Sequence, residues 1–301
     1  MRFTNPLEPI QRHVVTLVKQ MIRTRHTLAH MQEALGRIEA RQCAAAESPE
    51  LSKNEFKVYS QWGEDGIIQF LLRHVAVSRK VFVEFGVQDY TESNTRFLLT
   101  KDNWSGLVLD GNQRDIDFIK QDPIYWRHNL KAVCAFITRD NINALLRENG
   151  LSGEIGLLSV DIDGNDYWVW ERIDAVNPAI VIAEYNSRFG DKRSVTVPYD
   201  PEFVREKAHH SCAYYGASLP ALVALGNKKG YAFVGSNSAG SNAFFVRRDL
   251  RPPSLPELTA REGYIARQFR EARDEQGNLA HLSPEAEAAM LEKLPLVEVS
   301  P

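Results

Sequence analysis

Short apolar runs alternate with amphipathic segments through most of the chain from Val58 onward. The apolar runs predict buried strands at 81–85, 106–110, 132–136, 155–161 and 180–184. The segments between them, where apolar residues recur every three or four positions, predict helices at 61–74, 95–99, 116–121, 142–148 and 167–173. This alternation predicts a parallel sheet that is covered by helices on both faces.

Two later apolar runs, at 231–234 and 242–246, flank a turn at 235–241 that is rich in Gly, Ser and Asn. They predict an antiparallel hairpin that closes the sheet. The predicted fold class is therefore α/β, with a Rossmann-like sheet of parallel strands plus a closing hairpin. The tail after Pro252 is rich in charge and proline, and it is predicted to be helical around 258–274 and 284–293, with no chemistry assigned.

The first 48 residues carry a different pattern, a heptad seam over about four repeats with one polar break. The seam residues are spaced alternately by four and three: Ile10, Val14, Leu17, Met21, Thr24, Leu28, Met31, Leu35 and Ile38. The pattern favours an intermolecular coiled coil, and hence a homo-oligomer. A helix packed on its own domain is one alternative, and loose association with an anionic membrane surface is another, because the segment is basic. We divide the chain into an N-terminal helix at 1–48, an α/β domain at 54–250 and a partly helical tail at 251–301.

Composition sets broad limits on the function. The 301 residues are 44% hydrophobic and 25% charged, as in an ordinary globular protein, and the formal net charge of −3 gives no signal for nucleic acid. The three cysteines are far apart with no CxxC spacing, so neither a disulfide framework nor structural zinc is predicted. No apolar run is long enough for a membrane span, and the N-terminus lacks the apolar core of a signal peptide, so we expect a cytoplasmic protein.

The strand predicted at 81–85 is followed by a glycine and a second acid, within the sequence VFVEFGVQD. Glycine lets the backbone turn and approach a ligand closely, and an acid at the end of the next strand accepts hydrogen bonds from a ribose diol. The loop lacks the second glycine of a pyrophosphate-cradling motif, which favours S-adenosylmethionine over a dinucleotide. The alternative for each acid is a structural cap. The predicted cofactor-binding residues at these two strand ends are Glu84, Gly86, Asp89, Asn94, Asp110, Gly111 and Asn112.

A second acidic group ends the strand at 155–161, in the sequence DIDGND. Packed carboxylates repel one another unless a cation or protons relieve the repulsion, and carboxylate oxygens from neighbouring strand ends suit Mg²⁺ or Mn²⁺. We therefore predict a metal site of Asp161, Asp163 and Glu184, with Asp161 also a cofactor contact and a candidate catalytic base. Capping of the helix that starts near Tyr167 is an alternative, and so is direct contact with the substrate.

Several other polar residues are candidates. Ser60, Gln61 and Asp65 form either a lid over the cofactor or the caps of the following helix. His209 and His210 are candidate general bases because imidazole titrates near neutral pH, and an exposed loop pair is the alternative. Arg188 and the basic loop at 191–193 are candidate contacts for a phosphate or an acidic sugar, against a solvated loop. The predicted substrate-binding residues are Asn165, Asn186, Arg188 and Tyr215.

Taken in order, five motifs resemble the FkbM-like class I methyltransferases, in particular bacterial members found with polysaccharide biosynthesis: SQWGEDG, FVEFGVQDYTESNT, WSGLVLDGN, LLSVDIDGNDYW and IVIAEYN. The similarity covers roughly residues 59–245. It implies S-adenosylmethionine and O-methyl transfer, often to a sugar or polyketide hydroxyl. Glu84, Gly86 and Asp110 fall on the cofactor motif, and Asp161 and Asp163 fall on the acidic motif after the fourth strand.

Two departures from the family pattern stand out. Gln88 occupies the place of a second glycine, and DIDGND stands where relatives often have an aspartate, a spacer and glutamate-glycine. The sequence thus predicts an S-adenosylmethionine-dependent O-methyltransferase that acts on a sugar or glycan hydroxyl, with a divalent cation as an assisting group. Two alternatives stay open. One is a metal-dependent glycosyltransferase with Asp161-Ile162-Asp163 as a DxD motif, and the other is a non-catalytic scaffold organised by the N-terminal coil.

Overall fold

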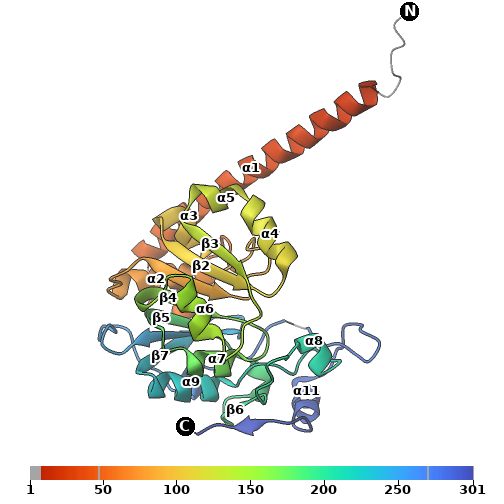
Figure 1. Cartoon of the computed structure of the whole chain (residues 1–301). Helices are drawn as coiled ribbons and strands as arrows, with labels where there is room; N and C mark the ends of the chain where they lie inside the picture. The colour runs from red at the N-terminus through yellow and green to blue at the C-terminus, as the bar shows by residue number, and fades with distance from the viewer. Residues whose placement is uncertain (1–7, 47, 270, 301) are drawn as a thin grey trace, which may run out of the picture.

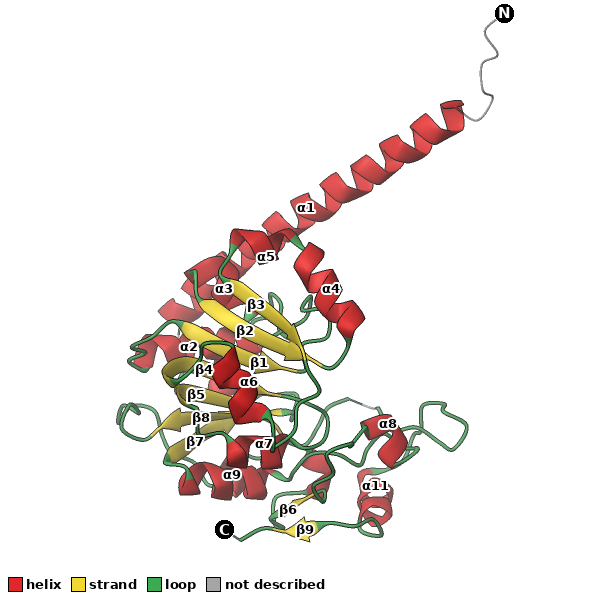
Figure 2. Ribbon diagram, viewed as in Figure 1, coloured by secondary structure: helices red, strands yellow, loops and turns green. Residues whose placement is uncertain are grey.

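A seven-stranded sheet lies at the centre of the computed structural model, which describes residues 8–46, 48–269 and 271–300, with side chains from residue 13 (Figure 2). The strand order is β3-β2-β1-β4-β5-β8-β7. The strands are β1 Val81–Phe85, β2 Ser105–Asp110, β3 Leu130–Cys134, β4 Gly153–Val160, β5 Val176–Glu184, β7 Tyr231–Ser236 and β8 Asn242–Arg247. Strands β1 to β5 are parallel, and β8 runs antiparallel to both β5 and β7. The predicted α/β class, with a parallel sheet and a closing hairpin, is confirmed.

The predicted strand bounds hold for β1 and differ at β3, β4 and β5. Strand β3 begins at Leu130 and ends at Cys134, two residues earlier than predicted, because it is an edge strand in which Lys131 is exposed between two buried neighbours. Strands β4 and β5 begin earlier than predicted because their first residues, which include Glu154 and Asn177, extend to the solvent-exposed end of the sheet.

Helices cover both faces of the sheet, because successive strand side chains point to opposite faces. Val83 and Phe85 pack in one apolar cluster with α6, α7 and α9, whereas Phe82 packs in the other with α2, α3 and α4. These helices are α2 Glu64–His74, α3 Arg96–Asp102, α4 Gln113–Gln121, α6 Ile142–Glu148, α7 Asp166–Arg172 and α9 Leu219–Lys228. Sequence analysis did not predict α9, nor the short α5 (Pro123–Arg127) and the 3-10 turn η1 (Leu51–Asn54).

The remaining small elements come from the segment after β5 and from the tail. They are η2 Ser187–Phe189, β6 Val195–Thr196, α8 Arg205–Ala208, α10 Ala260–Gly263, α11 Pro284–Leu291 and β9 Val297–Glu298. Helix α11 lies within the helix predicted at 284–293. The segment 258–274, predicted to be helical in part, is helical only in α10, and its residue 270 lies outside the described residues. Backbone N–H groups there bond to distant partners instead: Leu258 to the Phe233 carbonyl, at 2.9 Å, and Gln268 to the Ala239 carbonyl, at 3.1 Å.

Helix α1, at Glu8–Ala45, extends away from the sheet and its covering helices (Figure 1). Its C-terminal part rests on the domain, where Ala40 packs with Phe56, Val58, Tyr59 and Phe97. The predicted N-terminal helix is therefore present. The side chain of Ile10, the first residue of the predicted seam, lies outside the described part of the chain. Among the described helices, none is both long and apolar enough to cross a membrane.

Candidate functional site

The ends of β1, β2, β4 and β5 lie along one edge of the sheet. The strand order reverses between β1 and β4, and open α/β sheets bind ligands in the crevice outside such a point. Gly86 follows β1 with a φ of 67°, and a Cβ atom there would lie 1.9 Å from the Asp161 carbonyl oxygen after β4. The two strand ends therefore approach so closely that only glycine fits at position 86.

Two cavities adjoin at this point, since Gly86, Gln88 and Asp161 line both. The larger, which we call the β2–β3 cavity, has a volume of about 560 Å³. The smaller, which we call the β4–β5 cavity, has a volume of about 220 Å³. Its lining is dominated by polar side chains from seven separate segments: Gln61, Glu84, Gln88, Glu92, Ser93, Asn94, Asp161, Asp163, Glu184, Arg205, Asn242 and Glu271.

Asp110 is fixed at the mouth of the β2–β3 cavity by the backbone around it. One carboxylate oxygen accepts the Gln88 N–H at 2.8 Å, and the other accepts the Asn112 N–H at 2.8 Å. Each oxygen keeps a second lone pair, so the carboxylate can still accept hydrogen bonds from a ligand diol. Apolar residues 135–137 after β3 line the same cavity, as do Gly111 and Asn112, and Asn112 also caps α4.

Glu84 lines the β4–β5 cavity but uses its carboxylate to hold the loop before α3. It accepts hydrogen bonds from the Ser93 hydroxyl at 2.8 Å, the Asn94 N–H at 2.8 Å and the Thr95 N–H at 3.1 Å. Burial raises the pKa of this carboxyl. The acid inside an apolar strand is thus satisfied by protein groups, and Asn94, one of the residues it holds, lines the same cavity.

Asp161 and Glu184 form a half-buried acidic pair, with the buried Asp166 beside it. One oxygen from each of the three carboxylates lies within 4.8 Å of the others. Burial raises the pKa of Asp161 well above its usual range, and Asp163 and Asp166 add to that rise. Burial and the neighbouring Asp161 raise the pKa of Glu184 in the same direction, and Glu184 Oε2 has no hydrogen-bond partner among the described residues. The site is therefore a place for a shared proton or for a cation.

Asp163, predicted as the third metal ligand, is not part of that group. Its carboxylate forms an ion pair with Arg205, whose other amino group binds Glu271 at 2.7 Å. Asp166 takes its place next to Asp161 and Glu184, while also accepting the Ile162 and Gly164 N–H groups at 2.7 and 2.8 Å. Asp166 therefore holds the acidic loop in shape. It does not cap α7, whose N-cap residue Asn165 makes no side-chain cap hydrogen bond.

Arg205 is the cation that borders the cavity. Its guanidinium lies 3.9 Å from the ring centroid of Tyr215, which is buried, and its Nε donates to the Cys212 carbonyl at 2.6 Å. Burial and nearby Glu184 raise the pKa of Tyr215, so this hydroxyl stays protonated. Tyr215, predicted to bind substrate, is not among the residues that line either cavity, and its ring packs on the Arg205 guanidinium instead.

The segment before α2 supplies one cavity residue and two structural ones. Gln61 lines the β4–β5 cavity. Asp65 and Ser60 are buried together, and Asp65 accepts the N–H groups of Val58, Tyr59 and Ser60 at 2.8, 2.7 and 2.8 Å. Burial raises the pKa of Asp65 to about 6. These contacts match the structural alternative for Ser60 and Asp65, and the lid interpretation applies to Gln61 alone.

The predicted bases lie elsewhere. Neither His209 nor His210, both in the described part of the chain, is among the residues that line the two cavities. The two rings pack on each other at 4.1 Å, and His209 Nδ1 bonds to the Ser211 hydroxyl at 2.7 Å. The geometry thus corresponds to the loop-pair alternative.

The other predicted contacts have different surroundings. Arg188 is buried, with its Nε 3.1 Å from Glu287 of α11. The Asn186 side chain donates to the Ala213 and Tyr215 carbonyls at 2.8 and 3.1 Å. Asn165 lines the β2–β3 cavity, and its side chain donates to the Asp200 carbonyl. Asp89 accepts the Thr91 N–H at 2.9 Å in a local turn. Asn165 is therefore the member of this set that reaches a cavity.

Comparison with known proteins gives likeness in structure only. No family model matches the chain, and no curated protein matches it. The N-terminal domain of EvdMO1 with SAH bound is similar with a TM-score of 0.40 at 13% identity, over 70% of this chain and 94% of that chain. A SAM-dependent methyltransferase from Aquifex aeolicus has a TM-score of 0.35 at 10% identity, over 59% of this chain and 87% of that chain. One from Clostridium acetobutylicum ATCC 824 has a TM-score of 0.38 at 7% identity, over 62% and 90%. Likenesses of this size assign no residue role.

Sequence analysis missed the contribution of the tail. Phe269 and Glu271 line the β4–β5 cavity, and Phe269 stacks on Trp62 with ring centroids 4.7 Å apart. Arg267 pairs with Glu271 at 3.0 Å, so it joins the Arg205 network. No local pattern marks these residues, because their partners lie far away along the chain.

Proposed function

We propose that this protein is an S-adenosylmethionine-dependent O-methyltransferase whose acceptor is a sugar or glycan hydroxyl. The observation that carries the proposal is the pair of adjoining cavities at Gly86, with Asp110 in one and the Asp161–Glu184 pair in the other. One cavity suits a nucleoside and the other suits a polar acceptor. The site lies where strand order reverses, which is the expected binding edge of this class of sheet.

The residues of the β2–β3 cavity fit an adenosine group. Its apolar lining at 135–137 suits a base, and Asp110 keeps lone pairs for two ribose hydroxyls. Gln88 and Asn112, whose N–H groups orient Asp110, fix that carboxylate before a ligand arrives. The methionine part would then extend past Gly86 toward the β4–β5 cavity, whose carboxylates favour a cationic group.

The chain's own task in methyl transfer is alignment and proton removal. S-adenosylmethionine, when bound, supplies an activated methyl group: an acceptor oxygen attacks the methyl carbon in line, the C–O bond forms, and the C–S bond to the sulfonium sulfur breaks. Glu184 and Asp161 lie at the end of the cavity that receives the acceptor, and their raised pKa values bring a carboxylate base closer to neutral pH. The acceptor proton is transferred to this pair and then released to solvent.

The charges around the β4–β5 cavity favour a neutral acceptor. Its lining includes Glu92, Asp163, Glu184 and Glu271, while Arg205 is already paired with two of these acids. A phosphate or a uronic acid would meet like charge there, whereas the hydroxyls of a neutral sugar can donate to carboxylates. Arg188, the sequence candidate for an acidic group, is buried on Glu287.

A Mg²⁺ or Mn²⁺ ion is compatible with the acidic pair and belongs to the proposal as an assisting group. Asp161, Asp166 and Glu184 would hold it, since all three offer oxygen atoms within 4.8 Å of one another. A bound cation would lower the pKa of an acceptor hydroxyl. Proton transfer to the carboxylate pair needs no such ion. A chelator would therefore stop methyl transfer if the mechanism uses a cation and leave it unchanged if it does not.

The decisive experiment is calorimetric titration of the full chain with S-adenosylhomocysteine, followed by a methyl-transfer assay. The titration compares wild type with Asp110→Asn and with Asp117→Asn, a matched change on the exposed side of α4. We expect binding by wild type and by Asp117→Asn, and at least tenfold weaker binding by Asp110→Asn. No binding by wild type would refute the proposal. The assay then compares methyl galactoside with galacturonic acid, each with and without Mg²⁺, and methylation of the neutral sugar is the expected result.

The rival functions have less support from the geometry. A DxD glycosyltransferase site needs Asp161 and Asp163 on one cation, but Asp163 is paired with Arg205. A non-catalytic scaffold gives no role to the half-buried acidic pair of Asp161 and Glu184. We also propose a cytoplasmic location, which the three free cysteines support, and a second copy of this chain as a partner.

A further inference from the structure

Helix α1 presents most of its large apolar side chains to solvent. Seven residues from 14 to 38 are between 42% and 71% exposed, and they follow the spacing of four and three that the sequence shows. We call them the outer seam: Val14, Leu17, Met21, Leu28, Met31, Leu35 and Ile38. Exposed apolar surface of this length mostly marks an interaction site.

The domain does not use the outer seam. The side chains of α1 that turn toward the domain are mostly small: Ala29, Gly36, Ala40 and Cys43, together with Glu33. A Cβ atom at Gly36 would lie 2.4 Å from Val58 Cγ2, which shows how closely this face approaches the domain. Because each residue turns an α-helix by about 100°, positions one or two after the seam residues lie on a different side. The C-terminal part of α1 thus packs on its own domain, as one alternative expected, but by a face other than the seam.

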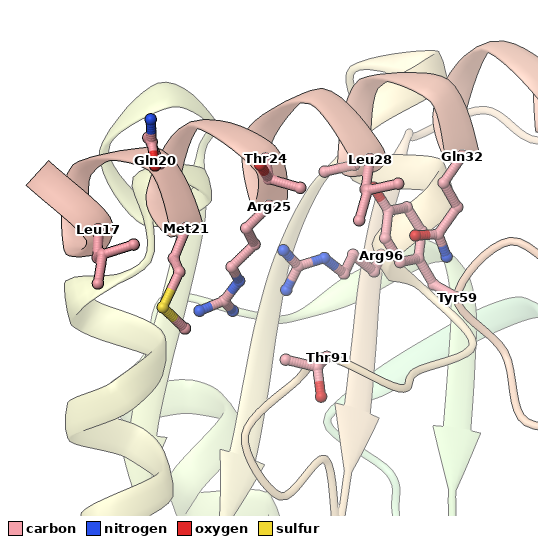
Figure 3. Close-up of a pocket in the computed structure, with 11 residues that line it drawn as sticks. Leu17, Gln20, Met21, Thr24, Arg25, Leu28, Gln32, Tyr59, Thr91 and Arg96 are labelled. Carbon is pink, nitrogen blue, oxygen red and sulfur yellow. The ribbon is translucent and has the colours of Figure 1, made fainter.

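A groove continues the outer seam down to the domain. It has a volume of about 610 Å³, with Leu17, Met21 and Leu28 on one wall and Tyr59, Thr91 and Arg96 on the other. Figure 3 shows Met21 and Arg25 projecting from α1 toward the side where Arg96 and Thr91 lie.

The domain wall of this groove is rigidly held. Arg96 donates to the Tyr90 carbonyl at 2.9 Å and pairs with Asp122 at 3.0 Å, and it lies 5.1 Å from the Tyr59 ring centroid. The groove thus exists before any partner binds.

We propose that α1 of a second copy of this chain packs along the outer seam and enters this groove. An identical helix carries the same four-and-three spacing, so the seam is complementary to itself. In a parallel pair the flanking positions would place Gln20 opposite Arg25 of the other copy, and Ala34 opposite Glu39. Neither pairing sets like charges against each other, so the flanks allow the association.

The outer seam alone supplies more than half of the area of a standard interface. Burying the exposed halves of seven apolar side chains removes on the order of 500 Å² per copy, against about 800 Å² per partner in a standard interface. The groove wall at Tyr59, Thr91 and Arg96 supplies further surface of the kind needed to reach that size. Thr91 in this wall is followed by residues 92–94, which line the β4–β5 cavity. The partner helix would therefore border the loop that is hydrogen-bonded to Glu84.

The test is the mass of the full chain in solution, measured by light scattering after size exclusion at chain concentrations of roughly 5–100 µM. Wild type is expected at twice the chain mass of 34.1 kDa. Met21→Glu with Leu28→Glu should return the mass to that of one chain. The matched control is Lys19→Glu, which changes the net charge by the same two units on an exposed position outside the seam, and it should keep the mass of wild type.

Wild type with the mass of one chain at the highest concentration would overturn the proposal, and so would a seam variant with the mass of wild type. Circular dichroism and S-adenosylhomocysteine binding report whether each variant is folded. Because the seam lies outside the core, a lost dimer with intact binding supports the proposal directly. If wild type is a single chain that sediments with phosphatidylglycerol vesicles and not with phosphatidylcholine vesicles, the seam is a membrane-binding face and the proposal fails. Both measurements are independent of methyl-transfer activity.

Discussion

The closest approach in the site, between Gly86 and the end of β4, gives the sharpest quantitative prediction. Replacing Gly86 by alanine adds two separate costs. The first is conformational, because a φ of 67° lies in the left-handed region, where a non-glycine residue costs roughly 1–2 kcal/mol. The second is steric, because the new Cβ would lie 1.9 Å from the Asp161 carbonyl oxygen, so one strand end must move by about 1 Å or more.

Overpacking of this kind costs roughly 1–3 kcal/mol, which brings the expected loss for Gly86→Ala to about 2–5 kcal/mol. Two other glycines serve as controls for the conformational and the steric cost. Gly150 has a φ of 81° with nothing within 4 Å of an added Cβ, so Gly150→Ala should lose only the conformational part, about 1 kcal/mol. Gly111 would meet only Phe136, at 3.6 Å, so Gly111→Ala should change stability by less than about 0.5 kcal/mol.

Urea denaturation followed by tryptophan fluorescence measures all three free energies of unfolding. Calorimetry with S-adenosylhomocysteine measures the second consequence, since a displaced β4 end moves Asp161 and the proposed cofactor-binding loop together. We expect binding at least tenfold weaker in Gly86→Ala and unchanged in Gly150→Ala. If Gly86→Ala lost no more stability than Gly150→Ala, the close approach of β1 and β4 would not be a constraint, and the argument from this glycine would fail.

Three further predictions concern the carboxylates. Asp110→Asn should weaken S-adenosylhomocysteine binding by 10- to 100-fold, about 1.5–3 kcal/mol for lost bonds to a charged group, while the free energy of unfolding changes less. Two charges no more than 4.8 Å apart repel by about 3 kcal/mol or more at an effective dielectric of 20, so Glu184→Gln should be more stable than wild type at pH 8 by about that amount. Because the pKa values of Asp161 and Glu184 are raised in the folded state, wild-type stability falls as pH rises. The difference in free energy of unfolding between Glu184→Gln and wild type should therefore shrink toward pH 5. An equal difference at both pH values would contradict this. Glu271→Gln should raise the KM for the acceptor by about tenfold with S-adenosylhomocysteine affinity unchanged, since it removes a cavity wall charge and one partner of Arg205.

The strand ends could be placed from the sequence because apolar runs and the polar residues after them reflect one physical constraint. A strand covered on both faces must be apolar throughout, and its first polar residue is where the covering ends. The rule works for β1 and β2, which lie inside the sheet, and it fails for β3 at the edge. There the run 132–136 is displaced from the true strand, because Leu130 packs inward beside an exposed Lys131.

The tail shows what a local pattern cannot contain. Its residues around Leu258 look amphipathic, yet the backbone of this segment bonds to Phe233 and Ala239, and Arg267 N–H bonds to the Ser187 hydroxyl at 3.1 Å. Each bond is made to a segment at least 25 residues away, and together they outweigh helix propensity, which is worth only tenths of a kcal/mol per residue. Phe269 and Glu271 reach the cavity by the same route, so no inspection of the tail alone could assign them to a site.

The candidate catalytic bases show most clearly which residues can be placed from the sequence and which cannot. Chemistry alone favours histidine, whose ordinary pKa is near neutral, and it led to His209 and His210. Position favours the carboxylates: β4 and β5 pair with Val160 opposite Ala183, so the next residues along each strand, Asp161 and Glu184, must be neighbours whatever the loops do. The histidines sit on a long connection between β5 and β7, where the chain path is set by contacts that the sequence does not reveal. A residue directly after a paired strand therefore has its location fixed by the sheet, and its pKa is then set by that location, as burial beside Asp161 does for Glu184.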